Sequence, residues 1–352
     1  MSIKITGSGS YIPSNKILNT NFSENVFLNE DGTPFKHDNQ TVIDKFYKIT
    51  GIKERRYANN NEQTSDMAFQ AAQKAIADAH LDAETLDYIV VAHNFGNVSC
   101  GSVQTDLIPS VASKVKHLLQ IKNPKCVAYD VIFGCPGWIE GMIQAHAFIK
   151  AGIAQKCLVI GAETLSRVTD PHDRDSMIYA DGAGATILEI TTEKGGVLAH
   201  ESASFTVEET DYLFFGKSYN LEATDNIKYI KMFGRKIYEF ALTHVPLAMK
   251  SCLDKSGFAI QDVKKILIHQ ANEKMDEAIV DRFYKLYEQE VPQEIMPMSI
   301  HTLGNSSVAT VPTLFDLIKH NQLEGHQFQT GDVIVLASVG AGMNINAIVY
   351  QV

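Results

Sequence analysis

The order of elements along this sequence repeats, and that repeat constrains the fold more than any other feature. In the first half, a helical pattern is followed by Leu81 and, eight residues later, by an apolar strand pattern that begins at Ile89. In the second half, a helical pattern is followed by Phe258 and, again eight residues later, by a strand pattern that begins at Ile266. Each half then has a polar His/Asn pair, a glycine-bearing turn into an apolar helix, and one more strand. A duplicated α/β unit explains this order; a chance match between short apolar patterns is the alternative.

Apolar runs that alternate with helical patterns indicate the fold class. Runs that are apolar at nearly every position are typical of strands buried on both faces by helices. A Ser/Asp cap signal and an apolar stripe predict a helix over 65–79, and a longer helical pattern covers 234–254. The predicted class is therefore α/β. The strand-like runs are YIVVAHN, CVAYDVI, CLVIGAE, GATILEI, KILIHQA and DVIVLAS.

The length fits two such units. At roughly 150 residues per domain, a chain of 352 residues predicts about two domains. We place the first over residues 1–195 and the second over 196–352, and we expect the functional site where equivalent turns of the two halves meet. The polar, turn-rich stretch over 20–42 is predicted to be a surface excursion.

Charge and composition exclude several classes of protein. The formal net charge of −10 argues against a nucleic-acid-binding surface, which needs clustered Lys and Arg. The sequence has no run of about 18 uncharged apolar residues, and MSIKITGSGSYIP does not match an export signal, so neither a membrane span nor secretion is expected. The five cysteines are scattered, and no CxxC or CxxH spacing predicts a metal site. We therefore expect a reducing, cytoplasmic setting.

Cys135 is the cysteine whose surroundings suit chemistry. It lies in DVIFGCPGWIEGMIQA, where a strand pattern ends, Gly134 makes a tight turn, and Pro136 stands at the expected first position of an amphipathic helix. The helix dipole and unpaired backbone N–H groups at such a position favour the thiolate. A nucleophile and a buried structural thiol are both compatible with this placement. The cysteines that lack it, and that we interpret as structural, are Cys100, Cys126, Cys157 and Cys252.

Two polar residues follow elements of the second half. His269 ends the strand pattern in KILIHQANEK, and α/β proteins build sites at the carboxyl edge of a sheet. A hydrogen-bonded core histidine is the alternative, as it is for His93, whose place in the first half mirrors that of His269. Asn305, in HTLGNSSVATVP, follows a glycine and precedes a helix, which suits either a helix cap or an amide that donates to a substrate oxygen.

Two glycine-rich stretches do not match nucleotide-binding loops. SVGAGMN, over 338–344, fits neither GxxxxGK[ST] nor GxGxxG, and we interpret it as backbone that approaches an acyl oxygen closely. DGAGA, over 181–185, is interpreted as a site of tight packing.

Several motifs together resemble the β-ketoacyl-acyl-carrier-protein synthase III family of the thiolase superfamily. The resemblance covers nearly the whole chain, and the order and spacing of the motifs make it specific. It implies a duplicated five-layered αβαβα thiolase fold and a homodimer. The motifs are GSGSYIPSN near the start, TGIKERR, TSDMA, GAETLSR, DGAGA, HQAN, GNSSVATVP and the final GAG.

The resemblance also implies a role for each candidate residue. Cys135 would take an acyl group from a primer thioester. His269 and Asn305 would hydrogen-bond the thioester carbonyl of malonyl-acyl-carrier protein and stabilise the enolate that remains when carbon dioxide leaves. The backbone N–H of Cys135 and one from the Gly340–Ala341 turn would hold the second oxyanion. The family needs no metal and no tightly bound cofactor; acyl-coenzyme A and acyl or malonyl carrier protein are its substrates.

The chain departs from the family pattern around the nucleophile and the acyl pocket. Pro136 follows the cysteine where the family has Ser or Ala, which removes a backbone N–H and stiffens the turn. Phe133 and Gly134 replace a pair of small residues, and Ile108 stands at a pocket position that Phe often occupies. We therefore expect Ile108 and Phe133 in the acyl pocket, and the identity of the primer stays open.

Four further residues are expected to contact coenzyme A or the carrier protein. Arg174, in DPHDR, matches the family's nucleotide-binding Arg, and Asn272 belongs to HQAN. Lys45 stands where a Trp often stacks on adenine, and Lys274 stands where an Arg often contacts the carrier. The two lysines either favour an acidic carrier over free coenzyme A or are solvated surface residues.

Four functions are compared on this basis. The first is fatty-acid initiation, which condenses a short acyl thioester with malonyl carrier. The second is a specialised enzyme of the dialkylresorcinol and cyclohexanedione-forming branch, which joins a β-ketoacyl thioester to a second acyl thioester. A Cys-His-Asn hydrolase needs His as the general base for Cys, whereas the expected geometry has both facing the substrate. A non-catalytic acyl-binding homologue disagrees with the intact triad.

Overall fold

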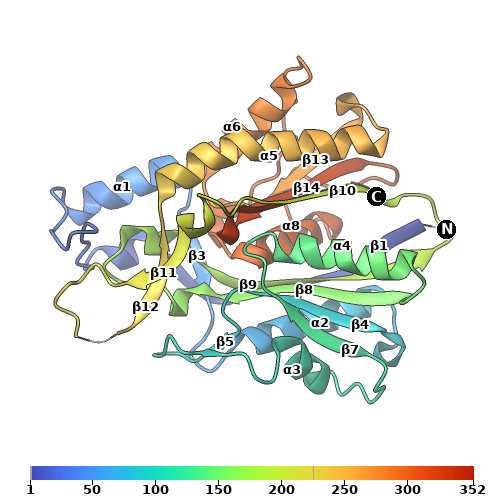
Figure 1. The fold of residues 1–352 in the computed structure, drawn as a ribbon, viewed down its shortest axis with the longest axis horizontal. Coiled ribbons are helices and arrows are strands. Elements are labelled where there is room, and N and C mark those ends of the chain that lie inside the picture. The colour runs from blue at the N-terminus through green and yellow to red at the C-terminus, as the bar shows by residue number, and fades with distance from the viewer. Residues whose placement is uncertain (1, 225) are drawn as a thin grey trace.

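Two β-sheets and three layers of helices make up the chain in the order αβαβα (Figure 1). The computed structural model describes residues 2–224 and 226–352. Strands of the first sheet lie within 2–191 and those of the second within 196–351, so each sheet belongs to one half of the sequence. The predicted α/β class and five-layered duplicated architecture are confirmed.

The first sheet has five strands in the order β1-β9-β8-β4-β7. β1 (Ser2–Tyr11) and β8 (Lys156–Thr164) both run antiparallel to β9 (Asp181–Thr191). β4 (Tyr88–Ala92) lies parallel to β8 on one side and to β7 (Val127–Val131) on the other. β7 is therefore an edge strand of this sheet.

The second sheet repeats this arrangement with four strands in the order β10-β15-β14-β13. β10 (Gly196–Ser204) and β14 (Val333–Gly340) run antiparallel to β15 (Asn344–Gln351), and β13 (Val263–Ile268) lies parallel to β14. Among the strands described, none in this sheet is the counterpart of β7. The internal repeat predicted from the sequence is thus confirmed for four strands in each half.

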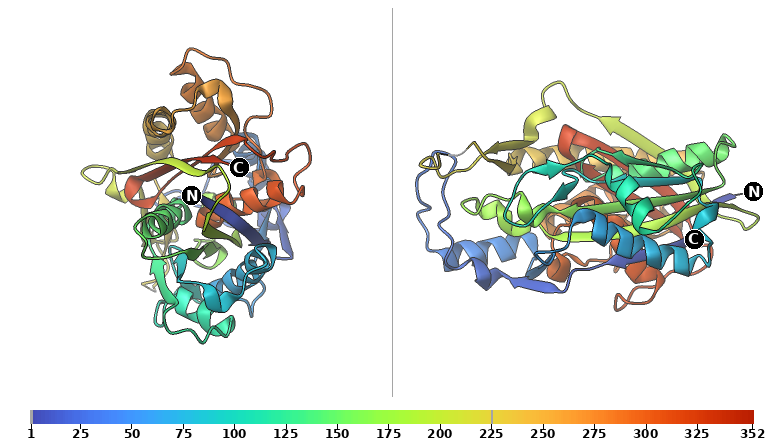
Figure 2. Two further views of the ribbon diagram at one scale, coloured as in Figure 1. Left: turned by 90° about the vertical axis from the view of Figure 1, so that its right-hand side faces the viewer. Right: turned by 90° about the horizontal axis from the view of Figure 1, so that it is seen from below.

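Helices α4 (Gly137–Lys150) and α8 (Thr310–Lys319) form the central layer between the sheets (Figure 2). Side chains of both sheets, such as Val159 and Leu336, share one buried core with these helices. The core joins the two halves through apolar contacts, whose burial is the main favourable contribution to folding.

The DGAGA motif lies in β9 against the central helix α8. A Cβ atom at Gly184 would lie 2.7 Å from the backbone nitrogen of Thr313, closer than any side chain tolerates. The motif therefore serves tight packing, as the sequence predicts.

Four helices form the two outer layers. α2 (Thr64–Asp78) and α3 (Val111–Leu118) cover the first sheet, while α5 (Gly234–Ser256) and α6 (Glu273–Lys285) cover the second. The two helices predicted from the sequence are α2 and α5, and both are confirmed within two residues at each end. Each outer core contains buried residues of its own half only.

The stretch over 20–42, predicted to be a surface excursion, is anchored in a small core of its own. Phe22 and Phe27 are buried there and pack with Phe46 of α1 (Asn39–Thr50) and with Ile178. The prediction missed these anchors because the stretch as a whole is polar and its apolar residues are few. The remaining strands and the short helix are β2 (Asn15–Leu18), β3 (Glu54–Tyr57), β5 (Asn97–Val98), β6 (Thr105–Asp106), β11 (Leu213–Lys217), β12 (Lys228–Met232) and α7 (Ile300–Leu303).

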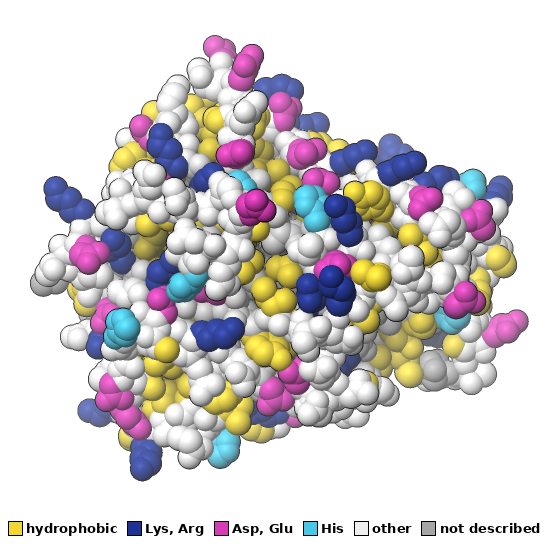
Figure 3. Space-filling view, turned by 180° about the vertical axis from the view of Figure 1, so that it is seen from behind, with side chains coloured by type: hydrophobic (Ala, Val, Ile, Leu, Met, Phe, Trp, Pro, Cys, Tyr) yellow, Lys and Arg dark blue, Asp and Glu magenta, His cyan; other side chains and the backbone are white. Residues whose placement is uncertain are grey.

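On the face that Figure 3 shows, no large surface patch carries charges of only one sign. Lys and Arg side chains there are interspersed with Asp and Glu. Within the described part of the chain, every helix is too short or too polar to cross a membrane.

Candidate active site

Cys135 lies where turns of the two halves touch. The turn after β7 places Gly134 at φ +68°, in the left-handed region that glycine tolerates. A Cβ atom at Gly134 would lie 2.6 Å from the backbone nitrogen of Ala341, and one at Gly340 would lie 2.3 Å from that of Cys135. The two backbones therefore approach each other as only glycines allow. Pro136 is the N-cap residue of α4. The sequence predicted it one position later, as the first residue of the helix.

Asn305 is fixed by hydrogen bonds on both sides of its backbone. Its N–H donates to the Ile178 carbonyl at 3.0 Å, and its carbonyl accepts from the Ala180 N–H at 2.8 Å. Its side-chain Oδ1 accepts from the Ser307 N–H at 2.8 Å. Because the amide oxygen is occupied in this way, the Nδ2 hydrogens are the group that Asn305 can offer to a ligand.

His269 follows β13, and its N–H extends the sheet by donating to the Ala337 carbonyl at 2.9 Å. The side chain is 4% exposed. Burial lowers the pKa of His269 to about 4, and an interaction with the Ser307 backbone partly opposes this shift. The imidazole is consequently neutral at pH 7, with one N–H that can donate.

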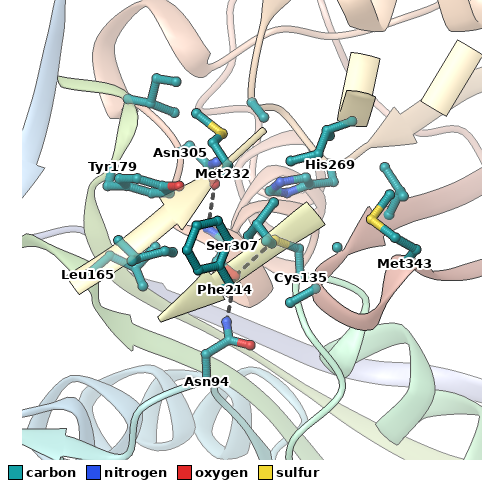
Figure 4. A pocket seen from close by; sticks show the side chains of 18 of the residues that line it. Asn94, Cys135, Leu165, Tyr179, Phe214, Met232, His269, Asn305, Ser307 and Met343 are labelled. Atoms are coloured by element: carbon teal, nitrogen blue, oxygen red, sulfur yellow. Dashed lines mark hydrogen bonds between the residues drawn. The ribbon is translucent and has the colours of Figure 1, made fainter. Parts of the chain in front are cut away.

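The protonation state of Cys135 differs from the expectation based on its place before a helix. Burial raises the pKa of the Cys135 thiol to about 12, and the hydrogen bond from Ser307 opposes this shift. The Ser307 Oγ–H donates to Sγ at 3.2 Å (Figure 4). The expected thiolate is therefore not the resting form, because desolvation outweighs the helix terminus. The thiol must lose its proton as it reacts.

These residues converge on one apolar cavity of about 280 Å³. Cys135, His269 and Asn305 all face it (Figure 4), and the Gly340–Ala341 turn forms part of its wall. The predicted triad and the predicted backbone turn are thus brought together, with both Cys135 and His269 directed at the space a substrate would fill. This is the geometry of a condensing site rather than of a protease, in which His must bind the nucleophile directly.

The two residues predicted for the acyl pocket lie elsewhere in the chain's own structure. Phe133 does not line the cavity; its neighbour Ile132 does. Successive residues of an extended segment point to opposite sides, so the prediction was one residue out of register. Ile108 is 90% exposed, in the segment between β6 and α3, and is also outside the cavity of its own chain.

Comparisons with known proteins give the family. The family model described as 3-Oxoacyl-[acyl-carrier-protein (ACP)] synthase III matches residues 129–204, and the model of its C-terminal part matches 253–352. A β-ketoacyl-[acyl-carrier-protein] synthase III of Staphylococcus saprophyticus is 32% identical over 349 residues, which cover 99% of this chain and 98% of that protein. The chain belongs to this synthase III family.

Other synthase III proteins agree along the whole length. A relative from Halalkalibacterium halodurans, β-ketoacyl-[acyl-carrier-protein] synthase III 1, is 31% identical over 96% of this chain and 95% of its own. The crystal structure of the 3-oxoacyl-[acyl-carrier-protein] synthase III from Aquifex aeolicus superposes with a TM-score of 0.82 at 29% identity, covering 100% of both chains. The fold is therefore the thiolase fold of synthase III enzymes.

A second cavity, of about 380 Å³, adjoins the synthase III site. The two share wall residues, including Ile178, Met232 and Ala271, so the second cavity is an approach to the first. The predicted contacts Lys45, Arg174 and Asn272 line it, whereas Lys274 is exposed and lies outside.

Asn272 also caps a helix. Its Oδ1 accepts from the Met275 N–H at 3.1 Å at the start of α6. Arg235, at the start of α5, adds a cation to the same cavity and was not predicted. Its position among other basic residues, in KYIKMFGRK, gave no distinct chemical signal.

The hairpin of β11 and β12 forms a wall of the synthase III cavity that the sequence analysis missed. Phe214 and Phe215 of β11, with Ile230 and Met232 of β12, line the cavity. The pattern YLFFGK before a polar turn was the available signal, since paired aromatic residues and a glycine are typical of a short hairpin.

The weaker candidates have structural roles or none. His93 is fully buried; its Nδ1 accepts from the Gly96 N–H and its Nε2 bonds Asp130, each at 2.9 Å, so the mirror of His269 does not reach the cavity. Among the other cysteines, Cys100 is exposed, and its Sγ–H donates to Asn60 Oδ1 at 3.3 Å. Those that are buried are Cys126, Cys157 and Cys252.

Proposed function

We propose that this chain is a β-ketoacyl-acyl-carrier-protein synthase of type III, an acyltransferase that acts in fatty-acid or related biosynthesis. The observation that supports this most strongly is the convergence of Cys135, a neutral His269 and the free amide of Asn305 on one apolar cavity. That set is suited to holding a thioester carbonyl beside an acylated thiol.

In the first step, Cys135 Sγ attacks the carbonyl carbon of a primer thioester. A C–S bond forms to Cys135, the C–S bond to coenzyme A or the carrier breaks, and the thiol proton leaves with the released thiol. The backbone N–H groups of Cys135 and Ala341, which lie beside Gly340 and Gly134, are the proposed donors to the oxyanion that forms. Pro136 supplies no N–H here, so the donors are those of Cys135 and the Gly340–Ala341 turn.

In the second step, malonyl carrier enters and loses carbon dioxide. The electron pair of the broken C–C bond moves into an enolate, whose oxygen accepts from the His269 N–H and the Asn305 Nδ2–H. The enolate carbon then attacks the acyl-Cys135 carbonyl, and the Cys135 thiolate leaves and takes up a proton. The product is a β-ketoacyl carrier, and no cofactor takes part.

Delivery of the acyl groups is proposed for the second cavity. Its wall holds Lys45, Arg174 and Arg235, whose charges suit the phosphates of coenzyme A or of phosphopantetheine on the carrier. Arg174 lies over the Phe35 ring at 5.2 Å, which restricts its position. Lys274 is exposed beside this entrance and suits a contact with an acidic carrier protein.

A homodimer is proposed from the edge of the first sheet. β7 has a free edge within the described structure, and Val127 on it is 45% exposed. Ile108, 90% exposed and apolar, suits burial in a second copy, where it would reach the acyl cavity of that copy. In this arrangement, residues 1–195 and 196–352 form one site together and neither half acts alone.

The test is a panel of acyl thioesters, presented with malonyl carrier to the full chain. We expect a mass shift on Cys135, then a linear β-ketoacyl carrier with loss of carbon dioxide. Cys135→Ser is the control, and retained acylation in that variant would refute the nucleophile. A cyclic dione as product would select the specialised branch instead of fatty-acid initiation.

A further inference from the structure

A buried carboxyl group is connected to the nucleophile through two other side chains. Glu163, in β8, is fully buried. Its Oε1 accepts from the Asn94 backbone N–H at 2.9 Å and also from the Asn94 side-chain Nδ2. Its Oε2 has no hydrogen-bond partner among the described residues. The condensation mechanism above makes no use of this group.

The side-chain amide of Asn94 links Glu163 to Ser307. Its Nδ2 also donates to Ser307 Oγ at 3.0 Å (Figure 4). The amide has two hydrogens on Nδ2, and Glu163 and Ser307 each accept one. Glu163 Oε1 accepts from the Asn94 backbone N–H, so it is the carbonyl oxygen when the carboxyl is neutral; if the amide were reversed, its oxygen would face Oε1 without a proton between them. Glu163 therefore decides which way the Asn94 amide points.

The direction of the Ser307 hydroxyl follows from that of Asn94. Because Ser307 Oγ already accepts from Asn94, its own hydrogen must point to another acceptor, and Cys135 Sγ is 3.2 Å away. Ser307 also holds a left-handed φ of +52°, which is unfavourable for any residue with a side chain. A glycine at position 307 would avoid that strain, so the presence of a serine indicates that its hydroxyl has a function.

We propose that Glu163 is a positioning residue for Cys135. It orients Asn94, Asn94 orients the Ser307 hydroxyl, and that hydroxyl donates to Cys135 sulfur and stabilises the thiolate. The thiolate appears when the thiol gives up its proton to the leaving group, and again when the acyl group departs. This inference rests on the proposed function only in taking Cys135 as the nucleophile.

The charge of Glu163 fits this role. Burial raises the pKa of Glu163 to about 8, so the carboxyl is mostly protonated at pH 7. A neutral carboxyl still accepts through its carbonyl oxygen, and it adds no negative charge near a thiolate. An amide oxygen has the same accepting capacity, so Gln is expected to replace Glu here.

The titratable groups near these four linked side chains do not change the charge around Cys135 in the pH range of the experiment below. His269 has a pKa of about 4, and the pKa of Tyr179 is raised well above its usual value of 10.0, so neither titrates between about pH 6 and 9. Asp181 is bonded to the Ala58 and Ser166 backbone N–H groups and to the Ser166 hydroxyl, and not to Asn94 or Ser307.

The experiment measures alkylation of Cys135 by iodoacetamide against pH, read by mass spectrometry of the peptide that contains it. A hydrogen bond to a charged group supports about a ten-fold effect, so Ser307→Ala and Glu163→Leu should each slow the reaction at pH 7.5 about ten-fold and shift its profile to higher pH. Glu163→Gln should restore the wild-type rate at pH 7.5, where the Glu163 carboxyl is mostly neutral. Asp276→Asn, a change at another fully buried carboxyl that has no bond to this chain of residues, should leave it unaltered.

A double variant separates positioning from general disturbance. If Glu163 acts through Ser307, Glu163→Leu combined with Ser307→Ala is no slower than Ser307→Ala alone. The proposal is overturned if the rate reductions of the two single variants multiply in the double variant. It is also overturned if Glu163→Leu has the wild-type profile, or if Glu163→Gln is as slow as Glu163→Leu. Should Glu163→Leu not fold, Asn94→Val removes the Nδ2 donor to Ser307 Oγ and must show the Ser307→Ala profile. Alkylation uses no thioester or malonyl group, so it stands or fails independently of condensation.

Discussion

At the scale of single residues, the three site residues were predictable because each lies next to an apolar run. Cys135 and His269 end strand patterns, and Asn305 precedes an apolar helix. Their protonation states were not predictable, since burial sets them and depends on the opposite half of the chain. Asn94 and Glu163 were missed because nothing local to either residue shows that they meet.

His269 is expected to act on malonyl carrier and not on the primer. In His269→Ala, release of carbon dioxide from malonyl carrier should fall about 100-fold or more, because one donor to the enolate oxygen is lost. Acylation of Cys135 should proceed nearly as before, as measured by intact mass. If acylation disappears together with decarboxylation, His269 is a base for Cys135 and the condensing assignment fails.

The raised pKa of Glu163 predicts a pH dependence of stability. Its carboxyl has a pKa of about 8 when folded, above its usual value of 4.5, so it stabilises the folded state below pH 4.5 and that contribution is lost as pH rises towards 8. Glu163→Gln has no such loss. Its free energy of unfolding in urea, relative to wild type, should therefore rise by more than about 1 kcal/mol between pH 5 and pH 8. A constant difference would mean that Glu163 is ionised in the folded protein.

At the scale of elements, the sequence predicts helices and strands that belong to the repeat and fails where an element lies outside it. The repeat seen in the sequence starts at the helices that precede β4 and β13, so it did not point to β11 and β12, which come earlier in the second half. Phe133 was predicted in the acyl pocket because it replaces a small residue of the family pattern, but Ile132 lines the cavity, since the exact residue at which β7 ends decides which side chain faces it. A shift of one residue exchanges the two faces.

The hairpin of β11 and β12 is held by a buried ionic cluster. Lys231 Nζ lies 2.6 Å from Asp170 Oδ2 and 2.9 Å from Asp173 Oδ2, and it is 2% exposed. Lys231→Met leaves two buried carboxylates without their cation, which should destabilise the protein by about 3–5 kcal/mol in urea unfolding. Lys285→Met, which breaks an exposed ion pair with Asp281, is the matched control and should leave the midpoint unchanged. Equal effects of both variants would contradict the buried cluster as an anchor.

At the scale of the whole molecule, the layers follow from the repeat, whereas the contact between copies does not. Two sheets with one apolar helix layer between them bury the continuous strand runs seen in the sequence. An edge strand looks the same in sequence as an inner one, so the exposed edge of β7 appears only in the fold.

The homodimer is expected to depend on that edge. Val127→Glu places a charge on β7, which opposes burial and pairing, so light scattering after gel filtration should show a smaller species. Val207→Glu, at a residue 96% exposed and outside both sheets, is the control and should keep the wild-type mass. A wild-type mass for both variants would place the interface elsewhere.

The glycine contact between the Gly134 and Gly340 turns also has a consequence for biosynthesis of the protein itself. Ala341 follows Cys135 by 206 residues. At about 5–20 residues per second, the ribosome takes roughly 10–40 s to make that stretch. Throughout that interval the nascent chain has Cys135 but lacks the Gly340–Ala341 turn that we propose as part of the oxyanion site. In the proposed mechanism, the site is therefore complete only when translation of the chain has nearly ended.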